Sequence, residues 1–154
     1  MIILEEVTVI EAAAGRCFDL ARSVEVHLLR NAHCGEGASA VGGVTTGLLE
    51  LDDSVTWRAR HFGIRWNLIS RISAFDRPNC FQDVQLRGPF ASMRHDHYFR
   101  RLAPERTEMR DFFALRAWIP FPGLRRYMRA LLQERARVIR DVAESGEWRS
   151  VPGL

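Results

Sequence analysis

The order of apolar and polar residues divides the chain into one strand, two short helices, a run of strands and a long last helix. Apolar and β-branched residues over 2–10 predict the first strand. Apolar residues at helical spacing over 12–20 predict a helix, and Ser23 is suited to cap a second helix that extends to Arg30. The segment 35–47, rich in Gly, Ser and Thr, is expected to form a strand with flexible ends.

From residue 54 onward, apolar runs of about eight to ten residues alternate with turn residues, which is typical of an antiparallel sheet. The predicted strands are residues 55–62, 66–75, 81–87, 91–102 and 106–118. Pro120 and Pro122 are expected to end the extended structure, because proline has no N–H to donate to a neighbouring strand. A helix is then predicted to begin at Leu124.

The last helix, predicted over 124–144, has one apolar stripe at i, i+3, i+4, i+7 spacing. The stripe is formed by Leu124, Tyr127, Met128, Leu131, Leu132, Val138, Ile139 and Val142, with Arg125, Arg126, Arg129, Arg137 and Arg140 on the opposite side. Arg135 projects into the middle of the stripe, where an unpaired guanidinium is costly to desolvate. We expect either an ion pair from Arg135 to Asp83 or Asp111, or an anchor for an oxygen-bearing ligand group.

Alternation along the strands assigns residues to an inner and an outer face. Turn positions predict that Asp83 lies opposite His95 and that His97 lies opposite Asp111. The inner face then holds Phe81, Asp83, Gln85, Met93, His95, His97, Phe99, Thr107, Met109, Asp111, Phe113 and Leu115, and a second inner set holds Trp57, Ala59, His61, Trp66, Leu68, Ser70 and Ile72. The outer face carries Arg58, Arg60, Arg94, Arg100, Arg106, Arg110 and Arg116, and it is expected to face solvent.

All 22 basic side chains are arginine, in a chain of net charge +3. The absence of lysine excludes Schiff-base lysine chemistry and a lysine-dependent phosphate loop. Residues 1–57 have an excess of acidic side chains and residues 58–154 an excess of arginine, which raises nucleic acid or an anionic surface as a partner. Because the strand and helix periodicities place most arginines on outer faces, nucleic-acid binding is not expected.

Hydrophobic content of 47% and aromatic content of 10% indicate one globular domain. The N-terminal residues lack a secretory signal, and the uncharged stretch 37–49 is too short and polar to span a bilayer, so we expect a cytoplasmic protein. Cys17, Cys34 and Cys80 form no CxxC pair and indicate neither a disulfide framework nor a thiolate zinc site. Cys34 is not expected to act as a nucleophile with the adjacent His33, because neighbouring residues rarely orient each other.

Several segments share sequence features with one known superfamily. They are residues 55–63 (VTWRARHFG), 72–78 (ISAFDRP), 87–90 (RGPF), 94–99 (RHDHYF) and 132–137 (LQERAR). On these segments the chain resembles the START/Bet v 1-like (SRPBCC) superfamily, in particular its bacterial polyketide cyclase/dehydrase and coenzyme Q-binding-like branch. The resemblance implies an α+β helix-grip fold, in which a curved antiparallel sheet of about six to seven strands wraps around a long C-terminal helix, with two short helices after the first strand. It places a single ligand-binding domain at 1–146 and a short tail at 147–154.

The resemblance further implies a cavity between the sheet and the last helix that accepts a largely apolar molecule, such as a lipid, a quinone or a polyketide. We expect a carrier or sensor of such a ligand, without a cofactor, as a monomer or homodimer. The expected ligand-binding residues are Trp57, His61, Asp83, Gln85, His95, His97, Phe99, Met109, Asp111, Phe113, Met128, Leu131 and Arg135. The alternative is a cyclase/dehydratase enzyme in which His97 or His95 is the general acid/base.

The inner histidines also allow a metal site. His95 and His97, with Asp83 and Asp111, are residue types that bind divalent metals. Because no third histidine lies close by in sequence, we expect hydrogen-bonded Asp–His pairs instead, and no metal.

The loop 118–122 is apolar and lies near several arginines, a composition that also suits contact with a membrane surface. We expect instead that Trp118 and Phe121 close the joint between the last strand and the last helix, with no stable membrane insertion.

Overall fold

A computed structural model describes residues 1–33, 38–119 and 121–154, and over these residues the chain forms one seven-stranded antiparallel sheet and three α-helices. The elements are β1 (Ile2–Ile10), α1 (Ala14–Ala21), α2 (Val24–His33), β2 (Ala38–Gly43), β3 (Ser54–His61), β4 (Ile64–Asp76), β5 (Cys80–Arg87), β6 (Ser92–Ala103), β7 (Arg106–Arg116), α3 (Leu124–Glu144) and the 3₁₀ helix η1 (Gly146–Ser150). Cys34 and Pro120 lie outside the described residues. The predicted α+β helix-grip architecture is confirmed.

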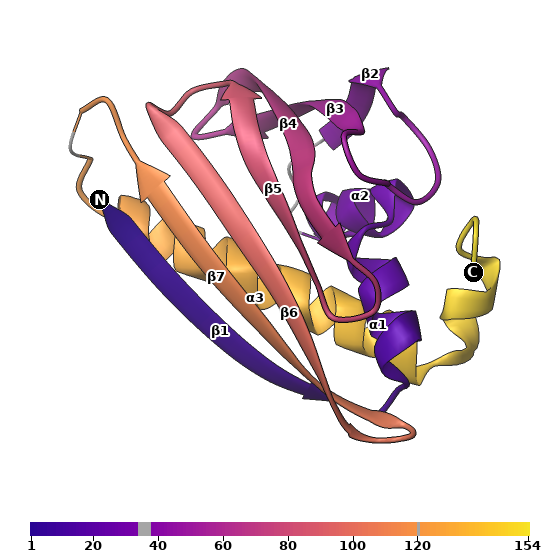
Figure 1. Ribbon diagram of the computed structural model, residues 1–154. Helices are drawn as coiled ribbons and strands as arrows, with labels where there is room; N and C mark the ends of the chain where they lie inside the picture. Colours follow the sequence, from indigo (N-terminus) through magenta and orange to yellow (C-terminus); the bar gives the residue numbers. More distant parts are fainter. Residues whose placement is uncertain (34–37, 120) are drawn as a thin grey trace.

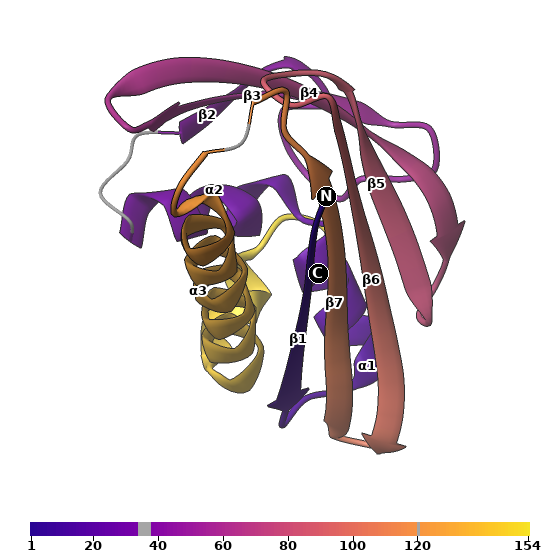
Figure 2. The same ribbon diagram turned by 90° about the vertical axis from the view of Figure 1, so that its left-hand side faces the viewer.

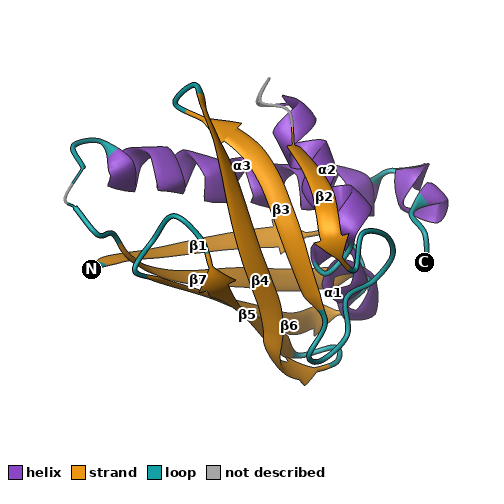
Figure 3. Ribbon diagram, turned by 90° about the horizontal axis from the view of Figure 1, so that it is seen from above, coloured by secondary structure: helices purple, strands orange, loops and turns teal. Residues whose placement is uncertain are grey.

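The strands lie in the order β1-β7-β6-β5-β4-β3-β2. The sheet is curved, and α3 runs along its concave side (Figures 1 and 2). Helices α1 and α2 lie at the end of the molecule toward which α3 runs (Figure 3). None of the described helices combines the length and the apolar character needed to cross a bilayer. The inner face of the sheet and the apolar stripe of α3 therefore enclose the interior.

Helix boundaries follow the capping chemistry of the sequence. The hydroxyl of Ser23 accepts a hydrogen bond from the N–H of Val26 (3.2 Å), which confirms Ser23 as the cap of α2. Helix α3 covers the predicted residues 124–144 and begins after Gly123, whose φ of 83° is accessible to glycine at little cost. The apolar stripe of α3 consequently lies at the expected positions against the sheet.

The C-terminal segment 147–154, expected as a short tail, has structure of its own. Part of it forms η1, and Val151 is buried in the hydrophobic core. The guanidinium of Arg16 on α1 lies 4.1 Å from the centre of the Trp148 ring. The segment thus packs against the rest of the domain.

The register between neighbouring strands decides which side chains meet on the inner face of the sheet. Asp83 pairs with His95 between β5 and β6, and His97 pairs with Asp111 between β6 and β7, both as predicted. The outer face is arginine-rich as expected, and its exposed members are Arg60, Arg94, Arg100, Arg106, Arg110 and Arg116. The polar inner residues therefore meet beneath α3 and the basic residues face solvent.

Two clusters of buried apolar side chains hold the fold together. In the first, the ring of Phe18 on α1 meets the rings of Phe75, Phe81 and Phe99 edge-on, with centroids 5.2–5.4 Å apart. The second cluster joins Leu4, Met93, Phe113, Leu115, Leu124 and Leu132. Members of both clusters also border an internal cavity, so the core is divided rather than continuous.

Candidate functional site

A cavity of about 500 Å³ lies between the sheet and α3. Its walls are mainly apolar, and the sheet contributes Trp57, Leu68, Ile72, Phe81, Met93 and Phe113. Helix α3 contributes Leu124, Met128, Leu131 and Leu132. A largely apolar cavity of this size with a few polar groups is typical of a site for a small molecule.

Most of the residues predicted to bind a ligand line this cavity. They are Trp57, His61, Asp83, His95, His97, Phe113, Met128, Leu131 and Arg135. The remaining four residues do not line the cavity. Gln85 donates its side-chain N–H to the carbonyl of Phe90 (2.8 Å), and Asp111 lies behind the histidines. Phe99 and Met109 are packed in the first core cluster. Alternation predicts the inner face correctly but does not indicate how far along a strand the cavity extends.

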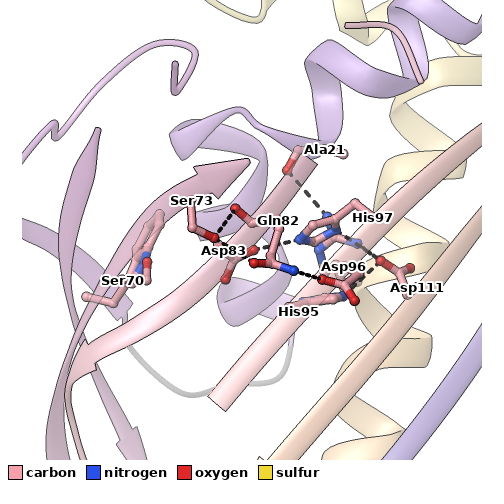
Figure 4. Close-up of polar contacts among 11 residues, drawn as sticks. Ala21, Ser70, Ser73, Gln82, Asp83, His95, Asp96, His97 and Asp111 are labelled. Atoms are coloured by element: carbon pink, nitrogen blue, oxygen red, sulfur yellow. Dashed lines mark hydrogen bonds and ion pairs between the residues drawn. The ribbon is translucent and has the colours of Figure 1, made fainter. Parts of the chain in front are cut away.

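The polar end of the cavity is a cluster of five buried or half-buried side chains, here called the polar cluster, formed by Asp83, His95, His97, Asp111 and Arg135. Strands β5, β6 and β7 contribute the first four, and α3 contributes the arginine. The antiparallel register sets the strand residues side by side, as Figure 4 shows.

Asp111 lies at the centre of the polar cluster. Its Oδ1 accepts hydrogen bonds from His95 Nε2 (2.9 Å) and Arg135 Nη1 (2.9 Å), and it lies 3.1 Å from His97 Nδ1. The expected ion pair of Arg135 is therefore made with Asp111. Because Arg135 also lines the cavity, the pairing and the cavity-facing position expected as alternatives occur together.

His97 has two possible hydrogen-bonding arrangements. Its Nε2 lies 2.6 Å from Asp83 Oδ2, while its Nδ1 lies 3.1 Å from both Asp111 Oδ1 and Arg135 Nη2. A protonated Nδ1 donates to Asp111, whereas an unprotonated Nδ1 accepts from Arg135. The ring is thus held on both edges in either arrangement.

The electrostatics of the cluster favour two ionised carboxylates. Burial raises the pKa of Asp111, but the charge of Arg135 and the hydrogen bonds from the histidines outweigh burial and hold that pKa well below its usual range. Burial likewise raises the pKa of Asp83, but the hydrogen bond from His97 outweighs it and the net shift is downward. Burial and the nearby His97 lower the pKa of His95 to about 4, so His95 is neutral near pH 7.

Tyr127 and His27, which were not among the expected ligand-binding residues, extend the site through contacts with His61 and Trp57. The imidazole of His61 contacts the hydroxyl of Tyr127, and the indole N–H of Trp57 donates to the hydroxyl of Ser70 (3.0 Å). The ring of His27 lies 4.0 Å from that of Trp57. Tyr127 belongs to the predicted stripe of α3, and that position was the signal available in the sequence.

The cavity opens to solvent beside a group of exposed apolar side chains, here called the apolar rim. These side chains line the cavity and are also exposed: Phe62, Ile64, Trp66, Trp118, Ile119 and Phe121. Trp118 is 73% exposed, so it does not fill a joint between β7 and α3. Phe121 packs edge-on against Phe62, with ring centres 5.1 Å apart. Of the two residues expected to close the joint, Phe121 is therefore packed against another aromatic ring, whereas Trp118 is exposed.

No protein-family model and no curated protein sequence matches the chain. Solved structures do match it. A START superfamily protein from Mycobacterium smegmatis has a TM-score of 0.68 at 14% identity, over 94% of this chain and 98% of that one. Major latex-like protein 151 from Panax ginseng has a TM-score of 0.65 at 16% identity, over 93% of this chain and 97% of that one.

A third similar structure is the di-domain ARO/CYC StfQ from the steffimycin biosynthetic pathway. Its TM-score is 0.62 at 19% identity, over 96% of this chain and 46% of StfQ, so the chain spans about half the length of that protein. These similarities show that the chain has the fold of START/Bet v 1-like proteins, which confirms the fold expected from the sequence resemblance.

Proposed function

We propose that the protein binds a hydrophobic small molecule with an oxygen-bearing group, such as a lipid, a quinone or a polyketide, as a carrier or sensor. The observation that carries this proposal is the cavity of about 500 Å³ with apolar walls and one polar end. The fold shared with START and Bet v 1-like proteins supports it.

The two parts of the cavity have different roles in this proposal. Apolar walls favour binding by roughly 0.8 kcal/mol for each buried methylene group, without fixing the orientation of the ligand. At the cavity wall, Arg135 offers N–H groups, His95 offers a ring nitrogen and Asp83 offers a carboxylate. These polar groups orient an oxygen function of the ligand toward this end of the cavity. The apolar rim gives a hydrophobic molecule a path into the cavity.

The test is displacement of a fluorescent apolar probe, anilinonaphthalene sulfonate, by fatty acids, short-chain quinones and naphthols. Leu131→Trp fills the cavity, because Leu131 lines it from α3. Leu102→Trp is the matched control, since Leu102 is 42% exposed and does not line the cavity. We expect Leu131→Trp to weaken probe binding at least tenfold and Leu102→Trp to leave it unchanged. Equal binding by both variants, with both folded by circular dichroism, would contradict the proposal.

A second candidate function is a cyclase/dehydratase activity with His97 as general acid/base. The observation that favours it is the 2.6 Å contact between Asp83 and His97 at the cavity wall, since a carboxylate that orients an imidazole is a common acid/base arrangement. We expect the wild type to convert a poly-β-ketone substrate mimic and His97→Gln to bind it unchanged. If the wild type returns the bound mimic unaltered, the carrier function is retained and the enzyme function is rejected.

A further inference from the structure

The polar cluster contains a set of metal-ligand residue types. Asp83, His95 and His97 each offer one ligand atom, and these atoms lie within 4.8 Å of one another. Both histidines project from alternate positions of β6, and Asp83 lies opposite His95 on β5, so the sheet backbone itself sets their spacing. Two imidazoles and one carboxylate suit zinc and similar divalent transition metals better than calcium or magnesium, which prefer oxygen ligands.

Asp111 contacts a ring nitrogen of both histidines. His95 donates from Nε2 to Asp111 Oδ1, and His97 has its Nδ1 3.1 Å from the same oxygen (Figure 4). When His97 carries its proton on Nδ1, both histidine N–H groups are directed at Asp111, and His97 Nε2 and the second nitrogen of His95 are left as lone-pair donors. Histidines that bind metals are commonly held by a carboxylate in this way.

The charges of the cluster also favour a cation. Two carboxylates, Asp83 and Asp111, face one guanidinium, that of Arg135. The second oxygen of Asp111, Oδ2, is buried and accepts no hydrogen bond from any described residue. A buried excess of negative charge is costly unless it is compensated.

We propose that Asp83, His95 and His97 bind one divalent transition metal ion, with Zn²⁺ as the best-suited metal and with an open position that faces the cavity. On binding, His97 carries its proton on Nδ1 instead of Nε2, and the Nδ1–H donates a hydrogen bond to Asp111. Arg135 Nη2 then loses its hydrogen bond to His97 Nδ1 but keeps its contact with the carbonyl of Ala21 (3.4 Å). The Asp83 carboxylate must turn to open its 2.6 Å contact with His97 to about 3.3 Å, as two ligands of one zinc ion require.

The position of Asp83 permits this movement, because its side chain is 20% exposed and lines the cavity. The open position of the metal would accept water or the oxygen of a bound molecule. This last point rests on the proposed hydrophobic ligand, whereas metal binding itself does not.

The experiment is calorimetric titration of the chelator-treated, dialysed protein with Zn²⁺ alone, repeated with Co²⁺ and its visible absorption. We expect one ion per chain, at least tenfold weaker binding by Asp83→Asn, and 10- to 100-fold weaker binding by Asp111→Asn. Asp96→Asn is the matched control, because Asp96 is a buried carboxylate of β6 that pairs with Gln82 outside the polar cluster. Its metal affinity should equal that of the wild type.

Asp83→Asn is the decisive variant, because Asp83 is the most exposed carboxylate of the cluster and its loss least endangers folding. Thermal unfolding checks that the variant is folded. Absence of stoichiometric binding by the wild type, or equal affinity in Asp83→Asn, would overturn the metal site. Probe binding in the cavity is measured on the same samples. If metal binding is absent and probe binding is retained, the metal site is rejected and the proposed function stands. If metal binding is present and probe binding is absent, only the proposed function is rejected.

Discussion

At the scale of single residues, the side chain of Asp111 connects the sheet to the helix. It is fully buried, and one of its oxygens contacts two histidines of β6 and the guanidinium of Arg135 on α3. Arg135 interrupts an otherwise apolar stripe, and that interruption was visible in the sequence. Which acidic partner it selects depends on the register of β7 against β6, which places Asp111 behind the histidines.

Arg135→Met should destabilise the protein by about 3–5 kcal/mol, because it leaves the Asp111 carboxylate buried without a charged partner. Denaturant unfolding measures the change. Arg137→Met on the same helix is the control, since Arg137 is exposed and should show no measurable effect. The double variant Arg135→Met with Asp111→Asn should recover part of the loss. A loss no greater than that of the control would contradict a structural role for the pair.

Asp19→Asn should make stability less dependent on acid pH. Asp19 is buried and accepts hydrogen bonds from Arg22 (2.9 Å) and Arg77 (2.7 and 3.0 Å). Burial raises its pKa, but the arginines outweigh burial and lower it below the ordinary value of 3.8. The ionised carboxylate therefore stabilises the fold above about pH 4, and this contribution is lost as the pH falls through the lowered pKa.

The check is the unfolding free energy of wild type and Asp19→Asn at pH 7 and near pH 3. The variant should be clearly less stable at pH 7, and the difference should shrink in acid. A difference that stays constant across this range would show that Asp19 contributes through packing alone.

At the scale of elements, the sequence predicts most of the fold because its periodicities are strong. The apolar stripe predicts the course of α3, and turn residues predict the pairing of Asp83 with His95. The exclusion of Phe99 and Met109 from the cavity could not be predicted. It depends on where α1 places Phe18, a contact between distant parts of the chain that no local pattern contains.

Phe18→Ala should cost about 3–5 kcal/mol of stability, because this fully buried ring fills the space between three aromatic side chains of the sheet. Phe112→Ala is the comparison, since Phe112 is only half-buried and lies on the outer face near Arg94. The denaturant midpoints of the two variants measure the loss of stability in each, and the loss should be larger for Phe18→Ala. Equal losses would mean that α1 does not organise this end of the core.

At the scale of the whole molecule, the basic outer surface is partly neutralised by the fold. Arginines of β6 and β7 form ion pairs across the sheet surface with acidic side chains. The pairs are Arg100–Glu108, Arg106–Glu11 and Arg110–Glu5, each with a closest distance of 2.9 Å. The acidic N-terminal segment thus compensates the arginine-rich remainder, although the two are far apart in sequence.

Binding to a short labelled DNA duplex should therefore be weak and confined to low salt, as judged by fluorescence anisotropy. Replacing Glu5, Glu11 and Glu108 by Gln should strengthen binding at low salt, since the paired arginines become available. Tight binding by the wild type at physiological salt would contradict this balance of charge.

The contact of α3 with β1 also affects how copies of the chain meet. β1 is an edge strand, and the outward backbone groups of such a strand invite pairing with a foreign strand. Arg125 on α3 donates to the Ile3 carbonyl (3.1 Å), and Gln133 donates to the Glu6 carboxylate (3.2 Å). The helix that closes the cavity therefore shields this edge as well. Any change that loosens α3 should promote self-association through β1 together with loss of the cavity.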